Sequence, residues 1–369
     1  MSRVCLGEVA VEHKETCKSS RDGYPVVGLE HLIPEEITLT EWDEGGDNTF
    51  TKVFRKGNVL FGRRRAYLKK AAVAPFDGIC SGDITVIEAI PDRILPELLP
   101  FVIQNDALFD YAVEKSAGSL SPRVKWEHLK NYEFELPEMS KQKALTEVLW
   151  SIDATKKAYQ RLIKQTDELV KSQFIEMFER ADFPIVTIGG LVDRNIKKVR
   201  ELGEKREFIH YIDISSINNI AKRVMGYVDY TIDMAPSRAQ QIIQKGDILI
   251  STVRPNLQNI AINPYSGDNF VASTGFCVLR CKKCLPEFLW GVVTSEKFTK
   301  AMCDNASGIS YPAIRDADVL QYQVPQAPLP LQEQFAEFVR QSDKSKFELE
   351  QALSELTATY KRIISENLG

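Results

Sequence analysis

The sequence predicts an α+β protein in which two domains of mixed α/β structure are each followed by a long α-helix. Two observations lead to this prediction. Residues 140–180 and 328–369 both have the apolar pattern of a long helix, and the segments before them, residues 1–139 and 181–327, share one order of strand-like and helix-like patterns. We expect the two helices to pack as an antiparallel coiled-coil-like pair that relates the two domains by pseudo-two-fold symmetry.

The long helices are predicted from apolar residues at seven-residue spacing. In the first helix the repeating residues are Leu145, Ile152, Tyr159 and Thr166. In the second helix they are Phe335, Ser342, Leu349, Leu356 and Ile363. At ~1.5 Å per residue each helix would extend to roughly 55 Å, which is more than a small globular core requires. We therefore expect the helices to hold the two domains apart.

The two domains read as copies of one unit. Residues 95–99 (LPELL) align without gaps to residues 285–289 (LPEFL). The same alignment pairs Gly118 with Gly308, Pro122 with Pro312 and Gln142 with Gln332. The inserts, residues 14–55 and 194–244, barely align. A kept framework with divergent inserts predicts two different binding surfaces.

Each domain is expected to combine short strands with one helical region. In the first domain we expect strands at residues 58–62, 71–74 and 83–88, and a helix over residues 96–115 that Pro100 interrupts. In the second domain we expect strands at residues 247–252, 260–262, 270–273 and 276–280, and a helix over residues 286–303.

Composition restricts the class of protein. The net charge is −4, so any binding of nucleic acid must come from local basic clusters and not from the overall charge. Seven scattered cysteines favour free thiols in a reducing compartment. No apolar run is long enough to cross a bilayer, and the first residues lack a signal-peptide pattern, so we expect a cytoplasmic protein that does not bind membranes.

Polar and cationic residues follow a predicted strand at equivalent places in the two domains. In the first domain they are Arg63, Arg64, Arg65, Tyr67, Lys69 and Lys70. In the second domain they are Ser251, Thr252, Arg254, Asn256, Gln258 and Asn259. Cations suit phosphates, and amide or guanidinium groups suit purine edges. One basic run is usually only a solvated turn, but two such loops at matching places favour contact with DNA.

A second pair of candidate loops follows the helical region of each domain. The candidate DNA-contact residues there are Ser119, Arg123 and Lys125 in the first domain, and Ser310, Tyr311 and Arg315 in the second. The backbone amides of glycine and serine beside Arg123 and Lys125, or beside Arg315, could hold a phosphate. A helix end followed by a turn explains the glycines of these loops equally well. A weaker basic cluster in the second insert contains Lys197, Lys198, Arg200, Lys205 and Arg206.

Three stretches resemble a known family. They are residues 246–255 (GDILISTVRP), residues 308–312 (GISYP) and the proline-rich entry to the last helix, residues 325–334. With them the chain resembles the specificity subunits of Type I restriction–modification systems over essentially its whole length. The first half matches more loosely, with Lys143 where the second half has Glu333.

The resemblance implies a non-catalytic DNA specificity subunit. Each domain would be a target-recognition domain that reads one half of a bipartite, asymmetric double-stranded DNA site, while the helices set the gap and dock two methyltransferase subunits. Restriction and translocase subunits can join such complexes. S-adenosylmethionine, ATP and magnesium would be used by those partners, and this chain would bind no cofactor. A protein-interaction scaffold without sequence-specific DNA binding is the alternative.

Catalytic and metal-binding interpretations have weaker support. Residues 263–265 (NPY) lack one proline of the tetrapeptide that holds the target amine in N6-adenine methyltransferases, and a turn explains them better. Cys281 and Cys284, with Cys277 and Cys303 nearby, could bind zinc, but the first half has no such set and buried thiols are preferred. The four histidines are isolated, and the sequence has no ATP-binding glycine loop. We therefore expect no catalytic or metal site.

Overall fold

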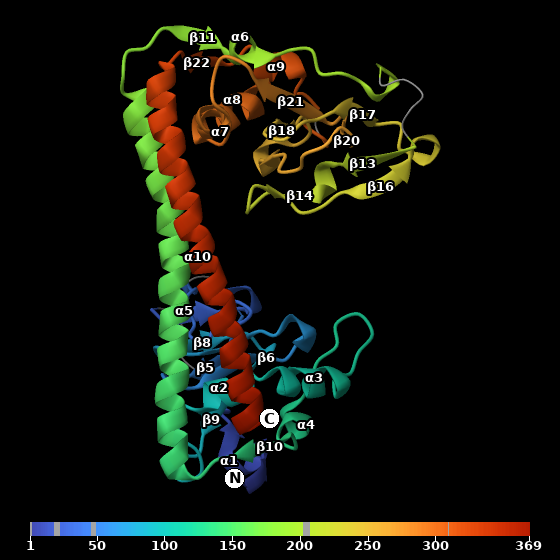
Figure 1. The fold of residues 1–369 in the computed structure, drawn as a ribbon. Coiled ribbons are helices and arrows are strands. Elements are labelled where there is room, and N and C mark those ends of the chain that lie inside the picture. Colours follow the sequence, from blue (N-terminus) through green and yellow to red (C-terminus); the bar gives the residue numbers. More distant parts are fainter. Residues whose placement is uncertain (1, 18–22, 46–48, 202–206, 309) are drawn as a thin grey trace. The chain divides into compact units, whose positions relative to one another are not determined.

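The computed structural model describes residues 2–17, 23–45, 49–201, 207–308 and 310–369 (Figure 1). The chain forms two compact units. Unit 1 contains Met1–Leu162 and Leu349–Gly369, and unit 2 contains Ile163–Glu348. Each unit holds a mixed α/β domain and a part of both long helices, which confirms the predicted mixture of strands and long helices.

Unit 1 is built on two four-stranded sheets, with strand orders β2-β9-β6-β7 and β4-β3-β8-β5, and a two-stranded sheet β1-β10. The strands are β1 (Ser2–Cys5), β2 (Ala10–Glu12), β3 (Pro25–Val27), β4 (Asp43–Glu44), β5 (Lys52–Phe54), β6 (Val59–Gly62), β7 (Ala71–Val73), β8 (Gly78–Cys80), β9 (Ile84–Ala89) and β10 (Glu133–Leu136). Its short helices are α1 (Leu6–Val9), α2 (Leu99–Ile103), α3 (Asp106–Glu114) and α4 (Trp126–Leu129). The strands expected at residues 58–62, 71–74 and 83–88 are confirmed as β6, β7 and β9.

Unit 2 contains a six-stranded sheet, β12-β21-β18-β19-β15-β14, a four-stranded sheet, β16-β13-β20-β17, and the pair β11-β22. The strands are β11 (Ile185–Thr187), β12 (Val192–Asp193), β13 (Phe208–Ile212), β14 (Ile217–Asn218), β15 (Arg223–Val224), β16 (Val228–Thr231), β17 (Ala239–Ile242), β18 (Ile248–Ser251), β19 (Ile260–Ile262), β20 (Phe270–Ser273), β21 (Phe276–Cys281) and β22 (Gln323–Pro325). Its helices are α6 (Ile188–Leu191), α7 (Pro286–Val293), α8 (Glu296–Asn305) and α9 (Asp316–Leu320). The four strands expected in this domain are confirmed as β18 to β21.

The helical region of each domain breaks at a place that the sequence prediction missed. Pro100 does not interrupt a helix, because it lies in the first turn of α2, where the missing N–H is not needed. The break instead precedes α3, where the Asn105 side chain accepts a hydrogen bond from the Ala107 N–H at 3.1 Å. The helix expected over residues 286–303 breaks at the aligned position, where Ser295 caps α8. Both domains thus share a capped second helix.

The long helices are confirmed as α5 (Met139–Phe174, green in Figure 1) and α10 (Leu329–Leu368, red). At the end of α5 the backbone changes to a π-helical turn over Ile175–Glu179. Unit 1 packs Leu149 of α5 and Tyr360 of α10 into one core with the sheet and helices of its domain. Unit 2 packs Phe174 of α5 against Phe335 of α10, with ring centroids 5.5 Å apart. No helix among the described residues has the length and apolar character of a membrane span.

Two buried glutamines join each domain to its following helix in the same way. The Gln142 side chain accepts from the Leu95 N–H at 2.9 Å and donates to the Pro137 carbonyl at 2.9 Å. The Gln332 side chain accepts from the Leu285 N–H and donates to the Ala327 carbonyl, both at 2.8 Å. Both glutamines are only 2% exposed. The duplication therefore extends to individual buried hydrogen bonds.

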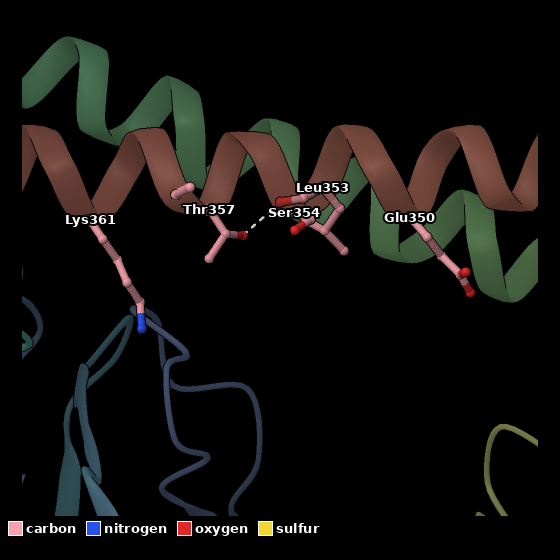
Figure 2. A pocket seen from close by; sticks show the side chains of 6 residues that line it. Glu350, Leu353, Ser354, Thr357 and Lys361 are labelled. Carbon is pink, nitrogen blue, oxygen red and sulfur yellow. Dashed lines mark hydrogen bonds between the residues drawn. The ribbon is translucent and has the colours of Figure 1, made fainter. Parts of the chain in front are cut away.

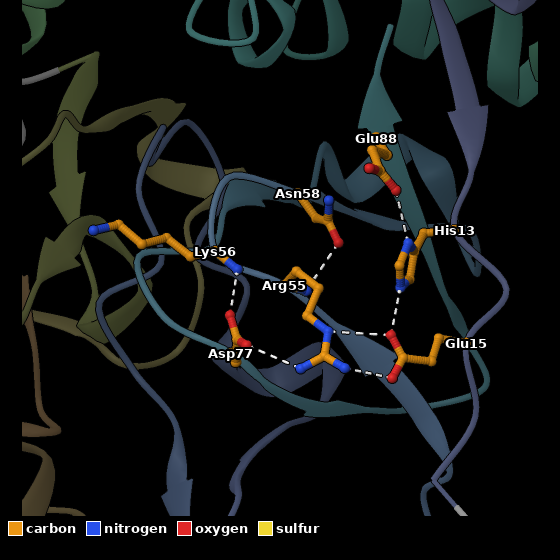
Figure 3. A network of polar contacts seen from close by, with 7 residues as sticks. All are labelled: His13, Glu15, Arg55, Lys56, Asn58, Asp77 and Glu88. Carbon is orange, nitrogen blue, oxygen red and sulfur yellow. Dashed lines mark hydrogen bonds and ion pairs between the residues drawn. The ribbon is translucent and has the colours of Figure 1, made fainter. Parts of the chain in front are cut away.

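A polar network on unit 1 connects the start of its insert to the turn before β6 (Figure 3). Arg55 contacts Glu15, and its Nη1 lies 3.0 Å from the Asp77 carboxylate. The His13 ring lies 2.7 Å from Glu88 and 3.2 Å from Glu15. The hydrogen bond from Arg55 lowers the pKa of Glu15. Because this network is solvent-exposed, it contributes little to stability and mainly orients the turn.

Replacing Gln142 by Ala should lower the free energy of unfolding by about 2–3 kcal/mol, because it leaves a backbone N–H and a backbone carbonyl without partners. Urea denaturation measures this change. Gln165→Ala is the matched control, since Gln165 is exposed on the same helix, and it should change stability by less than about 0.5 kcal/mol. Equal effects of the two substitutions would contradict the role given to Gln142.

Candidate nucleic-acid interface

In unit 1 the backbone joins the two loops that the sequence singled out separately. The Arg65 N–H donates to the Pro122 carbonyl at 2.8 Å, and the Val124 N–H donates to the Arg63 carbonyl at 3.0 Å. Arg64 and Arg123 form an antiparallel bridge between these hydrogen bonds. The loop after β6 and the loop after α3 therefore form one surface.

Unit 2 repeats this arrangement. The Arg254 N–H donates to the Pro312 carbonyl at 2.7 Å, and the Ile314 N–H donates to the Thr252 carbonyl at 2.9 Å. Val253 forms the corresponding bridge with Ala313. The loop after β18 and the loop after α8 are thus held together by the same hydrogen bonds as in unit 1. We call these two surfaces the paired loops of unit 1 and unit 2.

Each strand-exit loop contains a short 3₁₀ helix, Ala66–Leu68 in unit 1 and Pro255–Leu257 in unit 2. Left-handed residues flank both helices: φ is 54° at Arg65 and 51° at Lys69, and 51° at Arg254 and 49° at Gln258. Positive φ is uncommon at residues other than glycine. Its recurrence at two aligned positions, in four residues, shows that both copies hold Arg65 and Arg254 in one backbone conformation.

Asp83 lies among the arginines of the unit 1 paired loops. It accepts from Arg123 Nε at 2.7 Å, and Arg64 Nη1 lies 3.5 Å away. Arg64 also donates to the Ser121 hydroxyl at 3.1 Å. The hydrogen bond from Arg123 is the largest cause that lowers the pKa of Asp83. One carboxylate facing two guanidinium groups leaves a local positive charge, which suits a phosphate.

The other predicted residues of the unit 1 loops differ in accessibility. Lys69 Nζ lies 2.5 Å from Asp106 Oδ1, and Lys70 Nζ donates to the Leu29 carbonyl at 2.7 Å. Arg63 has a buried Nε without a hydrogen-bond partner among the described residues. The exposed side chains are Arg65, Tyr67, Ser119 and Lys125. Because these four side chains are exposed, a ligand at the surface of the loops can reach them.

In unit 2, the exposed side chains of Arg254 and Tyr311 stack on each other. The Arg254 guanidinium carbon lies 4.7 Å from the centre of the Tyr311 ring, and both residues are exposed. Such stacking restricts where the guanidinium points. Ser251, in contrast, is buried and donates to the Val253 carbonyl at 2.9 Å. Thr252 donates to the Gly275 carbonyl at 3.0 Å.

The remaining predicted residues of unit 2 lie around this pair. Asn256 and Ser310 are exposed, while Asn259 is half-buried. Gln258 donates to the Thr299 hydroxyl at 2.8 Å. Arg315 pairs with Asp318 at 3.1 Å, although its side chain stays 83% exposed. Lys197 and Lys198 are exposed in the insert. Of the same basic cluster, Lys205 and Arg206 lie outside the described residues.

Sequence reasoning missed the parts of the inserts that touch these loops. In unit 2, Asn219 Nδ2 donates to the Leu257 carbonyl at 3.0 Å, and Lys222 Nζ donates to the Gln258 carbonyl at 2.8 Å. Asp83 and Ser121 were also missed. No pattern could have identified them, because an isolated acidic or small polar residue carries no signal until the fold places it beside arginines.

The NPY stretch and the cysteines, which were considered as methyltransferase and zinc sites, have structural explanations. Asn263 is fully buried, donates to the Gln244 carbonyl at 3.0 Å and accepts from the Tyr265 N–H, so it stabilises a turn. The cysteines are free thiols, and burial raises the pKa of Cys277. Across the described ranges, no group of three or more His, Cys, Asp or Glu side chains is placed to hold a metal ion.

An open hollow of about 450 Å³ lies along α10 in unit 1 (Figure 2). Its lining residues are Glu350, Leu353, Ser354, Thr357, Ala358 and Lys361. They follow one another at three- or four-residue spacing or as direct neighbours, so they form one face of this helix. Glu350 and Lys361 lie about 16 Å apart along the helix axis, which is too far for the two charges to act on one small ligand.

The duplicated mixed α/β domain presents one loop framework with different side chains in each copy, an arrangement typical of recognition proteins. Residues 182–357 match the family described as Type I restriction modification DNA specificity domain. Residues 182–357 therefore belong to the family of Type I restriction–modification DNA specificity domains.

Comparisons of structure agree in fold. The S subunit of a Type I restriction–modification system from M. genitalium has 13% sequence identity and a TM-score of 0.56, covering 100% of this chain and 96% of that chain. A chain from a structure described as the basis of complex assembly and conformational transition of the type I R-M system has 18% identity and a TM-score of 0.57, covering 99% and 97%. No curated protein sequence gives a significant match.

Replacing Asp83 by Asn tests the balance of charge in unit 1. Because the folded pKa of Asp83 is lowered, its ion pairs stabilise the fold above the unfolded value of about 3.9, and this contribution is lost as pH falls through the folded pKa. The variant should be about 1 kcal/mol less stable near neutral pH, and the difference should shrink below pH ~4. Urea denaturation across this pH range checks it.

Glu133→Gln is the control for Asp83→Asn, since Glu133 pairs with Arg3 on the exposed β1-β10 sheet. Glu133→Gln should change the free energy of unfolding less than Asp83→Asn does. If the difference between the wild type and Asp83→Asn were the same at low and at neutral pH, the ion pairs with Arg64 and Arg123 would not be the cause.

Proposed function

We propose that this chain is the non-catalytic DNA specificity subunit of a Type I restriction–modification enzyme, binding a bipartite, asymmetric double-stranded DNA site. Two target-recognition domains, residues 1–139 and 181–327, would each read one half-site. The spacer helices, residues 140–180 and 328–369, would set the gap and recruit two methyltransferase subunits. The observation that carries this proposal is the shared backbone frame of the paired loops, which presents Arg65 in one unit and Arg254 in the other.

The two half-sites would be read with different chemistry. In unit 1, Arg65, Arg64 and Arg123 concentrate positive charge, which suits phosphates and guanine. In unit 2, the aligned neighbourhood has Arg254 stacked on Tyr311 and an exposed Asn256. Arginine suits guanine and asparagine suits adenine. An asymmetric site follows from one frame that carries different side chains.

The spacer helices would pair antiparallel. Contacts inside each unit support this, because the partner on α10 lies closer to the start of its helix as the partner on α5 lies closer to the end of its own. In unit 1, Lys156 of α5 lies 4.8 Å from the Tyr360 ring of α10. In unit 2, Lys346 of α10 lies 2.7 Å from Asp167 of α5. The heptad spacing of both helices supports the same pairing.

The chemistry would belong to the partners. Methyltransferase subunits would use S-adenosylmethionine for N6-adenine methylation, and restriction and translocase subunits would use ATP and magnesium. This chain would bind none of these and would act in the cytoplasm. The alternative, a scaffold that binds proteins through both domains, predicts no DNA sequence preference, and the DNA specificity family of residues 182–357 disfavours it.

Mapping N6-methyladenine in cells that contain the chain and its methyltransferase partner tests the proposal. The wild type should produce methylation at one bipartite sequence. Arg254→Ala should relax one half-site by about 1–3 kcal/mol of discrimination, because a bidentate contact to a base edge is lost. Arg65→Ala, the matched variant in unit 1, should relax only the other half-site.

Each variant keeps the other half-site as an internal control, which shows that the complex still assembles and methylates DNA. If neither variant changed the methylated sequence, the paired loops would not read bases. If methylation did not depend on this chain, the specificity role itself would fail.

A further inference from the structure

The turn that connects β14 to β15 in unit 2 has a fixed conformation. Asn218 Oδ1 accepts from the Ile220 N–H at 3.0 Å and from the Ala221 N–H at 2.9 Å, which forms an Asx turn. Lys222 ends the turn with a left-handed φ of 53°. β15 in turn pairs with β19 in the main sheet of the unit. The tip of the hairpin is therefore oriented by its own hydrogen bonds.

The turn is attached directly to the paired loops of unit 2. Asn219 donates to the Leu257 carbonyl at 3.0 Å. Lys222 Nζ donates to both the backbone carbonyl and the side-chain Oε1 of Gln258, each at 2.8 Å. Gln258 ends the 3₁₀ helix that begins after Arg254. The turn and the strand-exit loop after β18 therefore form one continuous surface.

Ile220 stands at the tip of this turn and is 90% exposed. Its neighbour across the anchored contact, Leu257, is 40% exposed. An aliphatic side chain this exposed stabilises nothing within the unit, and it would gain free energy only by contact with an external apolar group. Because the local hydrogen bonds already hold the turn in one conformation, Ile220 would lose little conformational entropy on contact with a ligand.

Resting on the proposed function, we propose that the turn of residues 219–222 is a second DNA-reading element of unit 2, in which Ile220 contacts the C5-methyl group of a thymine. Among the base edges of the major groove, that methyl is the apolar group. Because Lys222 is hydrogen-bonded to Gln258, the turn lies on the same surface as Arg254, the surface that is proposed to face DNA. In unit 1, the described residues hold no hairpin like β14–β15 beside β7, which pairs with β6 and forms a single-residue bridge to Thr38, so we assign the contact to one half-site.

Substituting uracil for thymine tests this directly, because it removes only the methyl group. The chain assembled with its methyltransferase subunits is titrated with duplexes of the mapped site that carry uracil at one position of the half-site relaxed by Arg254→Ala. The wild type should bind one of these duplexes about fourfold more weakly than the thymine duplex. Ile220→Ala should bind the two duplexes equally, and Ile220→Val should keep part of the difference.

Met234→Ala is the matched control. Met234 is 75% exposed in the same insert, and no contact connects it to the paired loops within the described residues, so this variant should keep the wild-type preference for thymine. Unchanged discrimination at the remaining positions of the same half-site shows that unit 2 is folded in each variant.

The proposal is overturned if no uracil substitution weakens wild-type binding, if the half-site contains no A·T pair, or if Ile220→Ala keeps the preference for thymine. In each of these cases Arg254→Ala would still relax the half-site, so the proposed function would stand. A complex without any sequence preference would instead refute the proposed function.

Discussion

The backbone hydrogen bonds between the paired loops are the constraint on which this structure depends. In each unit a strand-exit loop is tied to the loop that follows the domain helices, through Pro122 in unit 1 and Pro312 in unit 2. These bonds hold a 3₁₀ turn between two left-handed residues. Such a conformation would not persist in a free loop. The frame therefore decides where Arg65 and Arg254 lie, while leaving the other side chains free to vary.

The acidic net charge of the chain makes this local arrangement important. A protein of charge −4 has no general attraction to DNA, so the contacts must be concentrated. In the proposed function, unit 1 would concentrate them as arginines around Asp83, and unit 2 as a stacked Arg254 and Tyr311 with amide groups nearby. Binding to unit 1 should depend more on salt, whereas unit 2 should depend more on the identity of bases.

Much of the fold could be predicted from the sequence because its signals are local. The heptad spacing predicted α5 and α10 to within a few residues, and the apolar runs predicted strands β18 to β21. The break before α3 was misplaced because Pro100 reads as a helix breaker, whereas α2 continues through Pro100 to Ile103 and Asn105 caps the start of α3.

The candidate site was harder to predict from the sequence. The loops could be found from their composition and matching positions, but their pairing depends on hydrogen bonds between residues about 60 positions apart, such as Arg65 and Pro122. The contacts made by the inserts, such as Lys222 with Gln258, had no sequence signal because the inserts do not align. Predictions of single residues in the loops did not reveal that Ser251 faces inward.

The proposed function requires that paired helices of fixed length separate two unlike readers of DNA. The most direct test inserts seven residues into both helices, by duplicating residues 160–166 in α5 and residues 339–345 in α10, which preserves the heptad pattern. The inserted length is about 10.5 Å, close to the rise of three base pairs. Mapping of N6-methyladenine should then show both half-sites unchanged and a gap about three base pairs longer. Methylation at the original spacing would contradict the account.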